Sequence, residues 1–127
     1  MLRNFVIVSA HKTCRSAREN DIASLQLRYI LKKHGYNPTP VLGSYNEVQE
    51  ESWRCEVRND VEVTDIASIA AGFQQETILV ERGDMGFLKM VDRPGVKEHC
   101  LGSRRVLSQA PKASDWSLID GSYIQFK

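Results

Sequence analysis

The sequence lacks the features of several common protein classes. Only three cysteines occur among its 127 residues, and they form no close pair, which argues against a disulfide framework. The apolar run Phe5–Val8 is far too short to span a bilayer, and the N-terminus shows no apolar stretch with a small-residue cleavage site. A cytoplasmic protein without a membrane segment is therefore the expectation.

Charge of one sign and phosphate-binding motifs are also missing. Lys and Arg number 17 against 16 Asp and Glu, a formal net charge of +1, so nothing in the charge favours nucleic acid as a partner. No glycine-rich loop supports a nucleoside triphosphate site, and the spacing defines no Ser-His-Asp or Cys-His constellation. His99 and Cys100 could supply two metal ligands, but there is no CxxC or HxxxH spacing, so neither metal nor cofactor is expected.

The residues that are present suit one packed domain. Apolar residues make up 42% of the chain, and the length fits a single domain over residues 1–127. One helix is expected from about Ser16 or Asn20 to His34, and a second with Thr64 as its N-cap and an apolar stripe ending at Phe73. Apolar runs and alternation predict five strands, at Phe5–Val8, Pro40–Ser44, Ser52–Arg58, Thr77–Glu81 and Phe87–Val91.

This order of elements predicts the fold class. A β-α-β-β-α-β core with a fifth strand, over residues 1–91, is typical of the ferredoxin-like α+β sandwich, with a β-rich C-terminal extension over residues 92–127. Asp120–Gly121 is the turn of a hairpin in that extension. Two helices would cover one face of the sheet, yet the first and fourth strands present apolar side chains on both faces. The extension or a second subunit must cover the other face, and we expect a cyclic homo-oligomer.

The connection between the second and third predicted strands carries unusual chemistry. A hairpin loop needs only Gly, Asn or Asp, but this one holds Tyr45, Glu47, Glu50 and Glu51. A phenol and carboxylates around a pocket would suit a cation, through Coulomb attraction and through the aromatic face. A solvated acidic loop is the simpler alternative for any one of these residues.

A second polar cluster follows the first strand. Chain turns at strand ends often build ligand sites. His11 could act as a general base, because histidine titrates near neutral pH, or could be an ordinary surface or hydrogen-bonding histidine. The cluster contains Ser9, His11, Lys12, Thr13, Arg15 and Asn20.

Three stretches together resemble a known family. They are "FVIVSA" with Asn20 at the front of the following helix, "GSYNE" followed by "EES", and "DIASIAAGFQQETILV". In this order they resemble the small bacteriophage enzymes that degrade S-adenosylmethionine, long called hydrolases and now understood as lyases. The likeness covers roughly residues 5 to 91.

The resemblance implies a function and a site. The family reaction splits S-adenosylmethionine into 5′-methylthioadenosine and L-homoserine lactone, by attack of the substrate's own carboxylate and without a cofactor. It also implies a trimer like the PII signalling proteins, with the substrate at subunit interfaces, and a role in phage counter-defence by depleting S-adenosylmethionine in the infected bacterium. Tyr45 and Glu51 would position the amino acid part as catalytic residues, and Ser9, Ala10, His11, Asn20 and Glu50 would bind substrate. Glu47, Glu50 or Glu56 could replace Glu51 as the key carboxylate.

Two other functions compete with this one. A trimer of this kind could bind an adenine nucleotide or S-adenosylmethionine without cleaving it, because a fold does not fix a function. Alternatively, the chain could be a phage inhibitor of a host enzyme, with the acidic loop imitating a charged partner.

Overall fold

The computed structural model describes residues 3–45, 48–91, 98–112 and 115–127. The helices are α1 (Ala17–Lys33) and α2 (Asp60–Gly72). The strands are β1 (Asn4–Ser9), β2 (Thr39–Tyr45), β3 (Val48–Val57), β4 (Thr77–Arg82), β5 (Met85–Met90), β6 (His99–Leu107), β7 (Trp116–Ile119) and β8 (Ser122–Phe126).

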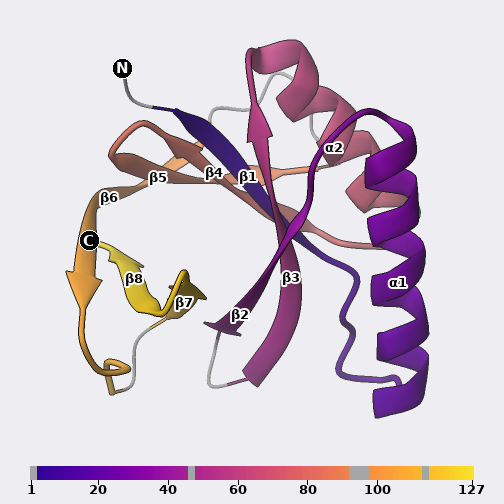
Figure 1. Ribbon diagram of the computed structural model, residues 1–127, viewed down its shortest axis with the longest axis horizontal. Helices are drawn as coiled ribbons and strands as arrows, with labels where there is room; N and C mark the ends of the chain where they lie inside the picture. The colour runs from indigo at the N-terminus through magenta and orange to yellow at the C-terminus, as the bar shows by residue number, and fades with distance from the viewer. Residues whose placement is uncertain (1–2, 46–47, 92–97, 113–114) are drawn as a thin grey trace.

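The described strands form one closed antiparallel barrel. Their order around the barrel is β1-β3-β2-β7-β8-β6-β5-β4, and β4 pairs with β1 to complete the circuit. Figure 1 shows both helices on one side of the barrel and the C-terminal strands β6, β7 and β8 on the opposite side. Helix α1 contacts β3, and α2 contacts β1, β3 and β4.

The predicted ferredoxin-like sandwich was wrong. The order of elements through β4 agrees with the prediction, but the sheet does not stay open. Strand β5 pairs with β4 and β7 pairs with β2, so β5 and the C-terminal extension together join the two edges that a ferredoxin-like sheet leaves free. The second apolar face, which favoured a subunit interface in a PII-like trimer, is thereby enclosed within the chain itself.

Strand β1 divides the apolar interior into two parts because its side chains alternate. Val6 and Val8 belong to the core under the helices, together with the fully buried Leu27 and Leu31 of α1. Ile7 points the other way and belongs to the core inside the barrel. That second core also contains Val41, Leu79, Ile119 and Ile124.

Local capping chemistry sets the helix starts. Ser16 caps α1 in a capping box with Glu19. The helix therefore starts with Ser16 as its N-cap, at the first of the two predicted starts and not at Asn20. Helix α2 starts before the predicted N-cap Thr64, because Asn59 accepts a 3.0 Å hydrogen bond from the backbone N–H of Glu62. None of the described helices has the length and apolar character to cross a membrane.

A buried ion cluster ties the barrel together. Glu81 on β4 is fully buried, and its carboxylate accepts two hydrogen bonds from Arg54 on β3, at 2.8 and 3.1 Å. Arg104 on β6 also pairs with Glu81. The Arg54 guanidinium lies 3.6 Å from the centre of the Phe5 ring. These contacts link strands that are not all neighbours in the barrel, so the cluster connects β3, β4 and β6 across the barrel interior.

Candidate active site

The β2–β3 hairpin places the candidate residues in strands rather than in a loop. Tyr45 is the last residue of β2 and pairs directly with Val48, so Glu50 and Glu51 lie within β3. The prediction that Tyr45, Glu50 and Glu51 lie in the connecting loop was therefore wrong, and Glu47 lies outside the described residues. Because neighbouring residues of a strand point to opposite faces, Glu50 and Glu51 cannot both face Tyr45.

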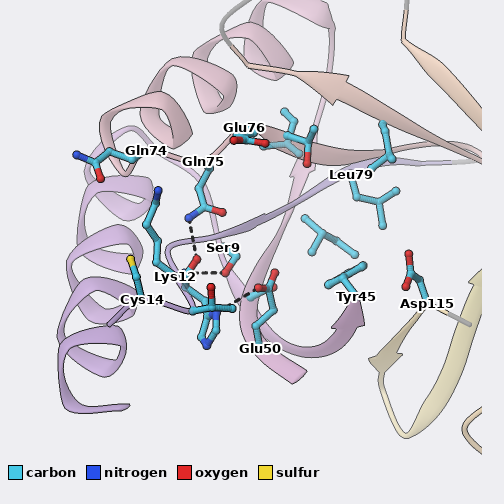
Figure 2. Close-up of a pocket in the computed structure, with 17 residues that line it drawn as sticks. Ser9, Lys12, Cys14, Tyr45, Glu50, Gln74, Gln75, Glu76, Leu79 and Asp115 are labelled. Carbon is cyan, nitrogen blue, oxygen red and sulfur yellow. Dashed lines mark hydrogen bonds and ion pairs between the residues drawn. The ribbon is translucent and has the colours of Figure 1, made fainter. Parts of the chain in front are cut away.

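A cavity of about 430 Å³ opens where this hairpin meets the end of β1. Figure 2 shows Ser9, Tyr45, Glu50, Gln75 and Asp115 among the side chains that line it. Its lining combines apolar side chains of the barrel interior with polar ones. The lining includes Ile7, Ser9, His11, Lys12, Tyr45, Glu50, Ser52, Gln75, Glu76, Leu79, Leu88 and Asp115.

Tyr45 is held by its own strand and by the C-terminal segment. Its ring lies over Gly43, where a Cβ atom would come within 2.9 Å of the ring Cζ and the hydroxyl oxygen. Its hydroxyl is 2.9 Å from Ser117 Oγ. Burial, together with the charges of Glu50 and Asp115, raises the pKa of Tyr45 to about 12, although the hydrogen bond to Ser117 acts in the opposite direction. The phenol is therefore protonated at neutral pH and can donate a hydrogen bond, but it cannot act as a base.

Glu50 supplies the carboxylate on the same face as Tyr45. It pairs across the hairpin with Gly43, and its Oε2 lies 3.4 Å from Nδ1 of His11. Burial raises the pKa of the Glu50 carboxyl, against a smaller effect of its hydrogen bond with Ser9. A carboxylate partly removed from water attracts a cation more strongly than a solvated one.

Hydrogen bonds fix the segment that follows β1. Ser9 Oγ accepts from the backbone N–H of His11 at 2.9 Å and donates to the Glu51 carbonyl at 3.2 Å. The Asn20 amide bonds both backbone groups of Lys12, at 2.9 and 3.0 Å. Gln75 donates to the His11 carbonyl at 3.1 Å. Asn20 therefore acts here as a support for the segment that carries His11 and Lys12.

Glu51 faces the other side of the sheet. It lines a separate cavity of about 310 Å³ with Asn20, and this cavity shares His11 and Glu50 with the larger one. The two cavities therefore adjoin along the side chains of His11 and Glu50. Glu56 lies at the far end of β3, opposite Phe5, and does not join either cavity.

The structure thus gathers most of the predicted site at one end of the barrel. Ser9, His11, Tyr45 and Glu50 line the larger cavity, and Asn20 and Glu51 line the smaller one. Ala10 is buried and lines neither, and its carbonyl accepts a hydrogen bond from Arg15 at 3.2 Å.

Sequence reasoning missed the residues that distant segments contribute. Asp115 and Ser117 come from the C-terminal segment, and Gln75 and Glu76 come from the turn after α2. Gln75 and Glu76 lie within the stretch "DIASIAAGFQQETILV", but nothing in it pointed to a role in the site. Asp115 and Ser117 belong to no local motif, and only the pairing of β7 with β2 could have revealed them. Within the described part of the chain, no group of three or more His, Cys, Asp or Glu side chains is arranged to hold a metal ion.

Comparison with known proteins decides the family. The model of the S-adenosylmethionine lyase family matches residues 6–127. The chain belongs to this family. This confirms the resemblance seen in the sequence and extends it through the C-terminal segment, which the quoted motifs did not reach. The protein is therefore an enzyme, an S-adenosylmethionine lyase, and S-adenosylmethionine is its substrate. A search of curated proteins gave no significant match.

Proposed function

We propose that this S-adenosylmethionine lyase forms 5′-methylthioadenosine and L-homoserine lactone by an internal displacement. An oxygen of the substrate's carboxylate forms a bond to its own γ-carbon as the γ-carbon–sulfur bond breaks. The electron pair of that bond stays on sulfur, and the positive sulfonium leaves as a neutral thioether. No water, external base or proton transfer is needed to balance this step.

Such a reaction needs the protein chiefly for orientation. The leaving group is already activated by its positive charge, and holding reacting atoms in attack geometry can remove several kcal/mol of the barrier. The observation that carries the proposal is the cavity in which a neutral phenol, Tyr45, lies on the same face as a half-buried carboxylate, Glu50. A cation fits beside the carboxylate, and a carboxylate oxygen of the substrate can accept a hydrogen bond from the phenol.

We assign the residues accordingly. Tyr45 positions the substrate carboxylate, and Glu50 attracts the cationic amino acid part. Glu51, with Asn20 in the adjoining cavity, is the alternative partner of the α-ammonium group. Ser9 and His11 are assigned to the adenosine end, whereas Ala10 contributes through the backbone that carries them.

Three variants test these roles. Tyr45→Phe removes only a hydroxyl, and Glu50→Gln and Glu51→Gln each remove only a charge. We expect Tyr45→Phe and Glu50→Gln to lower kcat/KM by at least about tenfold, and Glu51→Gln to have the smaller effect. A unit charge about 5 Å from a cation contributes roughly 3 kcal/mol at an effective dielectric constant of about 20. Full activity of both Tyr45→Phe and Glu50→Gln, with Glu51→Gln inactive, would move the site to the smaller cavity.

We also propose that the enzyme works as a homotrimer with substrate at the subunit interfaces. Support comes from apolar side chains left exposed on α1, at Ile22, Leu25 and Tyr29, which a neighbouring subunit could cover. Light scattering coupled to gel filtration gives the mass directly. A monomer that retains full activity would contradict an interfacial site.

The biological role we propose is phage counter-defence in the cytoplasm of the infected bacterium. Removing S-adenosylmethionine would deprive methyl-dependent host systems of their substrate. Expression in a bacterium should then lower both the cellular S-adenosylmethionine level and the methylation of its DNA. Unchanged levels of both, with active enzyme present, would count against this role.

A further inference from the structure

The phenol of Tyr45 meets a residue 72 positions away in the chain. Ser117 on β7 pairs directly with Gly43 on β2, and the Tyr45 ring lies over Gly43. Directly paired residues point to the same face of a sheet, and Tyr45 lies two residues after Gly43 on the same face of β2. The Ser117 side chain therefore lies beside the phenol. Its Oγ is 2.9 Å from the Tyr45 hydroxyl.

The serine partner of the Tyr45 hydroxyl is buried, so a water molecule cannot easily take its place. Ser117 is only 3% exposed, so water has little access to the serine side of the hydrogen bond. A phenol oxygen that accepts a hydrogen bond from a serine keeps its own proton available for another acceptor. With Ser117 as the donor, the Tyr45 O–H can point into the cavity toward a carboxylate oxygen of the substrate.

We propose that Ser117 is a positioning residue of the lyase site, which fixes the phenol of Tyr45 and directs its proton toward the substrate. This rests on the role proposed above for Tyr45. It assigns the C-terminal segment a function in catalysis, because β7 completes a site whose other polar groups come from β1 and the segment after it, from β2 and β3, and from the turn after α2. Ser117 itself makes no contact with the substrate.

A double-mutant cycle tests this assignment. Tyr45→Phe, Ser117→Ala and the double variant are compared in kcat and KM for S-adenosylmethionine. We expect Ser117→Ala to lower kcat by about tenfold, equivalent to about 1.36 kcal/mol, with a smaller change in KM. The double variant should be no slower than Tyr45→Phe alone, because Ser117 acts only through the hydroxyl that Phe lacks.

Two controls separate positioning from folding. Ser44→Ala removes another buried serine hydroxyl, on the opposite face of β2, and should leave kcat unchanged. Ser117→Thr and Ser117→Val have the same size and differ only in the hydroxyl, so the Thr variant should be clearly faster than the Val variant.

The outcomes are distinct. Tyr45→Phe slow but Ser117→Ala at wild-type kcat would overturn this inference alone. The inference would also fall if the two changes multiplied in the double variant, or if the Thr and Val variants were equally slow. Tyr45→Phe at full activity would overturn both the role of Ser117 and the proposed role of Tyr45.

Discussion

Adding one methyl group at Gly43 should disable the enzyme by displacing Tyr45. A Cβ atom there would come closest to the ring Cε2 and would lie 2.9 Å from Cζ and from the hydroxyl oxygen, whereas ordinary contacts begin at 3.4 Å. The overlap with Cε2 means that the ring must retreat by about 1 Å, and this loosens the 2.9 Å bond to Ser117. Gly43 does not have a positive φ, so backbone strain does not complicate the substitution.

The expected effect falls on catalysis more than on stability. Losing one hydrogen bond costs about 0.5–1.5 kcal/mol of folding free energy. A misplacement approaching 1 Å can cost roughly 100-fold in rate, so we expect kcat of Gly43→Ala to fall by roughly 10- to 100-fold. Steady-state kinetics with S-adenosylmethionine measures this, and thermal denaturation checks that the variant is folded.

Gly72→Ala is the matched control. Outside the adjoining backbone of its own helix, nothing lies within 4 Å of a Cβ added at Gly72, the last residue of α2, so activity should be unchanged. In a Tyr45→Phe background, Gly43→Ala should cause little further loss, since the hydroxyl is already absent. A Gly43→Ala enzyme with wild-type kcat would refute the reasoning that the fixed position of Tyr45 matters.

Further predictions concern charge and folding. Because burial raises the pKa of Glu50, its ionised form lowers stability at neutral pH, so Glu50→Gln should raise the melting temperature there. This difference should shrink as the pH falls through the pKa of folded Glu50 toward the unfolded value near 4.3, and an equal gap at all pH values would contradict it. Glu81→Gln leaves the partly buried Arg54 and Arg104 without their counter-charge and should cost about 3–5 kcal/mol in urea unfolding; a loss below about 1 kcal/mol would count against the ion cluster. Asn59→Ala removes the α2 cap and should cost about 1 kcal/mol in the same assay, whereas Thr64→Ala, at the predicted cap, should cost less.

Local signals made much of the secondary structure predictable. The start of α1 follows from Ser16 and Glu19, which satisfy each other's backbone groups within one turn. The apolar run Phe5–Val8 indicates a strand buried on both faces, and Val6 and Ile7 do face different cores. Such features depend on residues close together in the sequence.

Closure of the barrel depends on distant pairing and was not predictable in the same way. Gly86 on β5 pairs with Gly102 on β6, and Gly43 on β2 pairs with Ser117 on β7. The sequence around these residues gives no signal that would predict their partners. The apolar second face of β1 required a cover, but composition could not choose between another subunit and the chain's own C-terminal strands.

The candidate site shows the same division. The sequence identified Tyr45 and the neighbouring carboxylates as unusual, and the motif order identified the family. Which carboxylate faces Tyr45 depends on the register of β2 against β3, because a shift by one residue exchanges the faces of Glu50 and Glu51. The hairpin turn is shorter than the sequence suggested, and the resulting register places Glu50 on the face of Tyr45, which is why we propose Glu50 in place of Glu51.

The most direct test of the central claim is the origin of the γ-oxygen in the product. The enzyme is incubated with S-adenosylmethionine in ¹⁸O-labelled water, and the products are followed by mass spectrometry. An internal displacement predicts 5′-methylthioadenosine and unlabelled homoserine lactone; any homoserine formed later by opening of the lactone at its carbonyl carries label only in its carboxyl group. Homoserine labelled in its γ-hydroxyl group, without a lactone intermediate, would show attack by water and would contradict the mechanism.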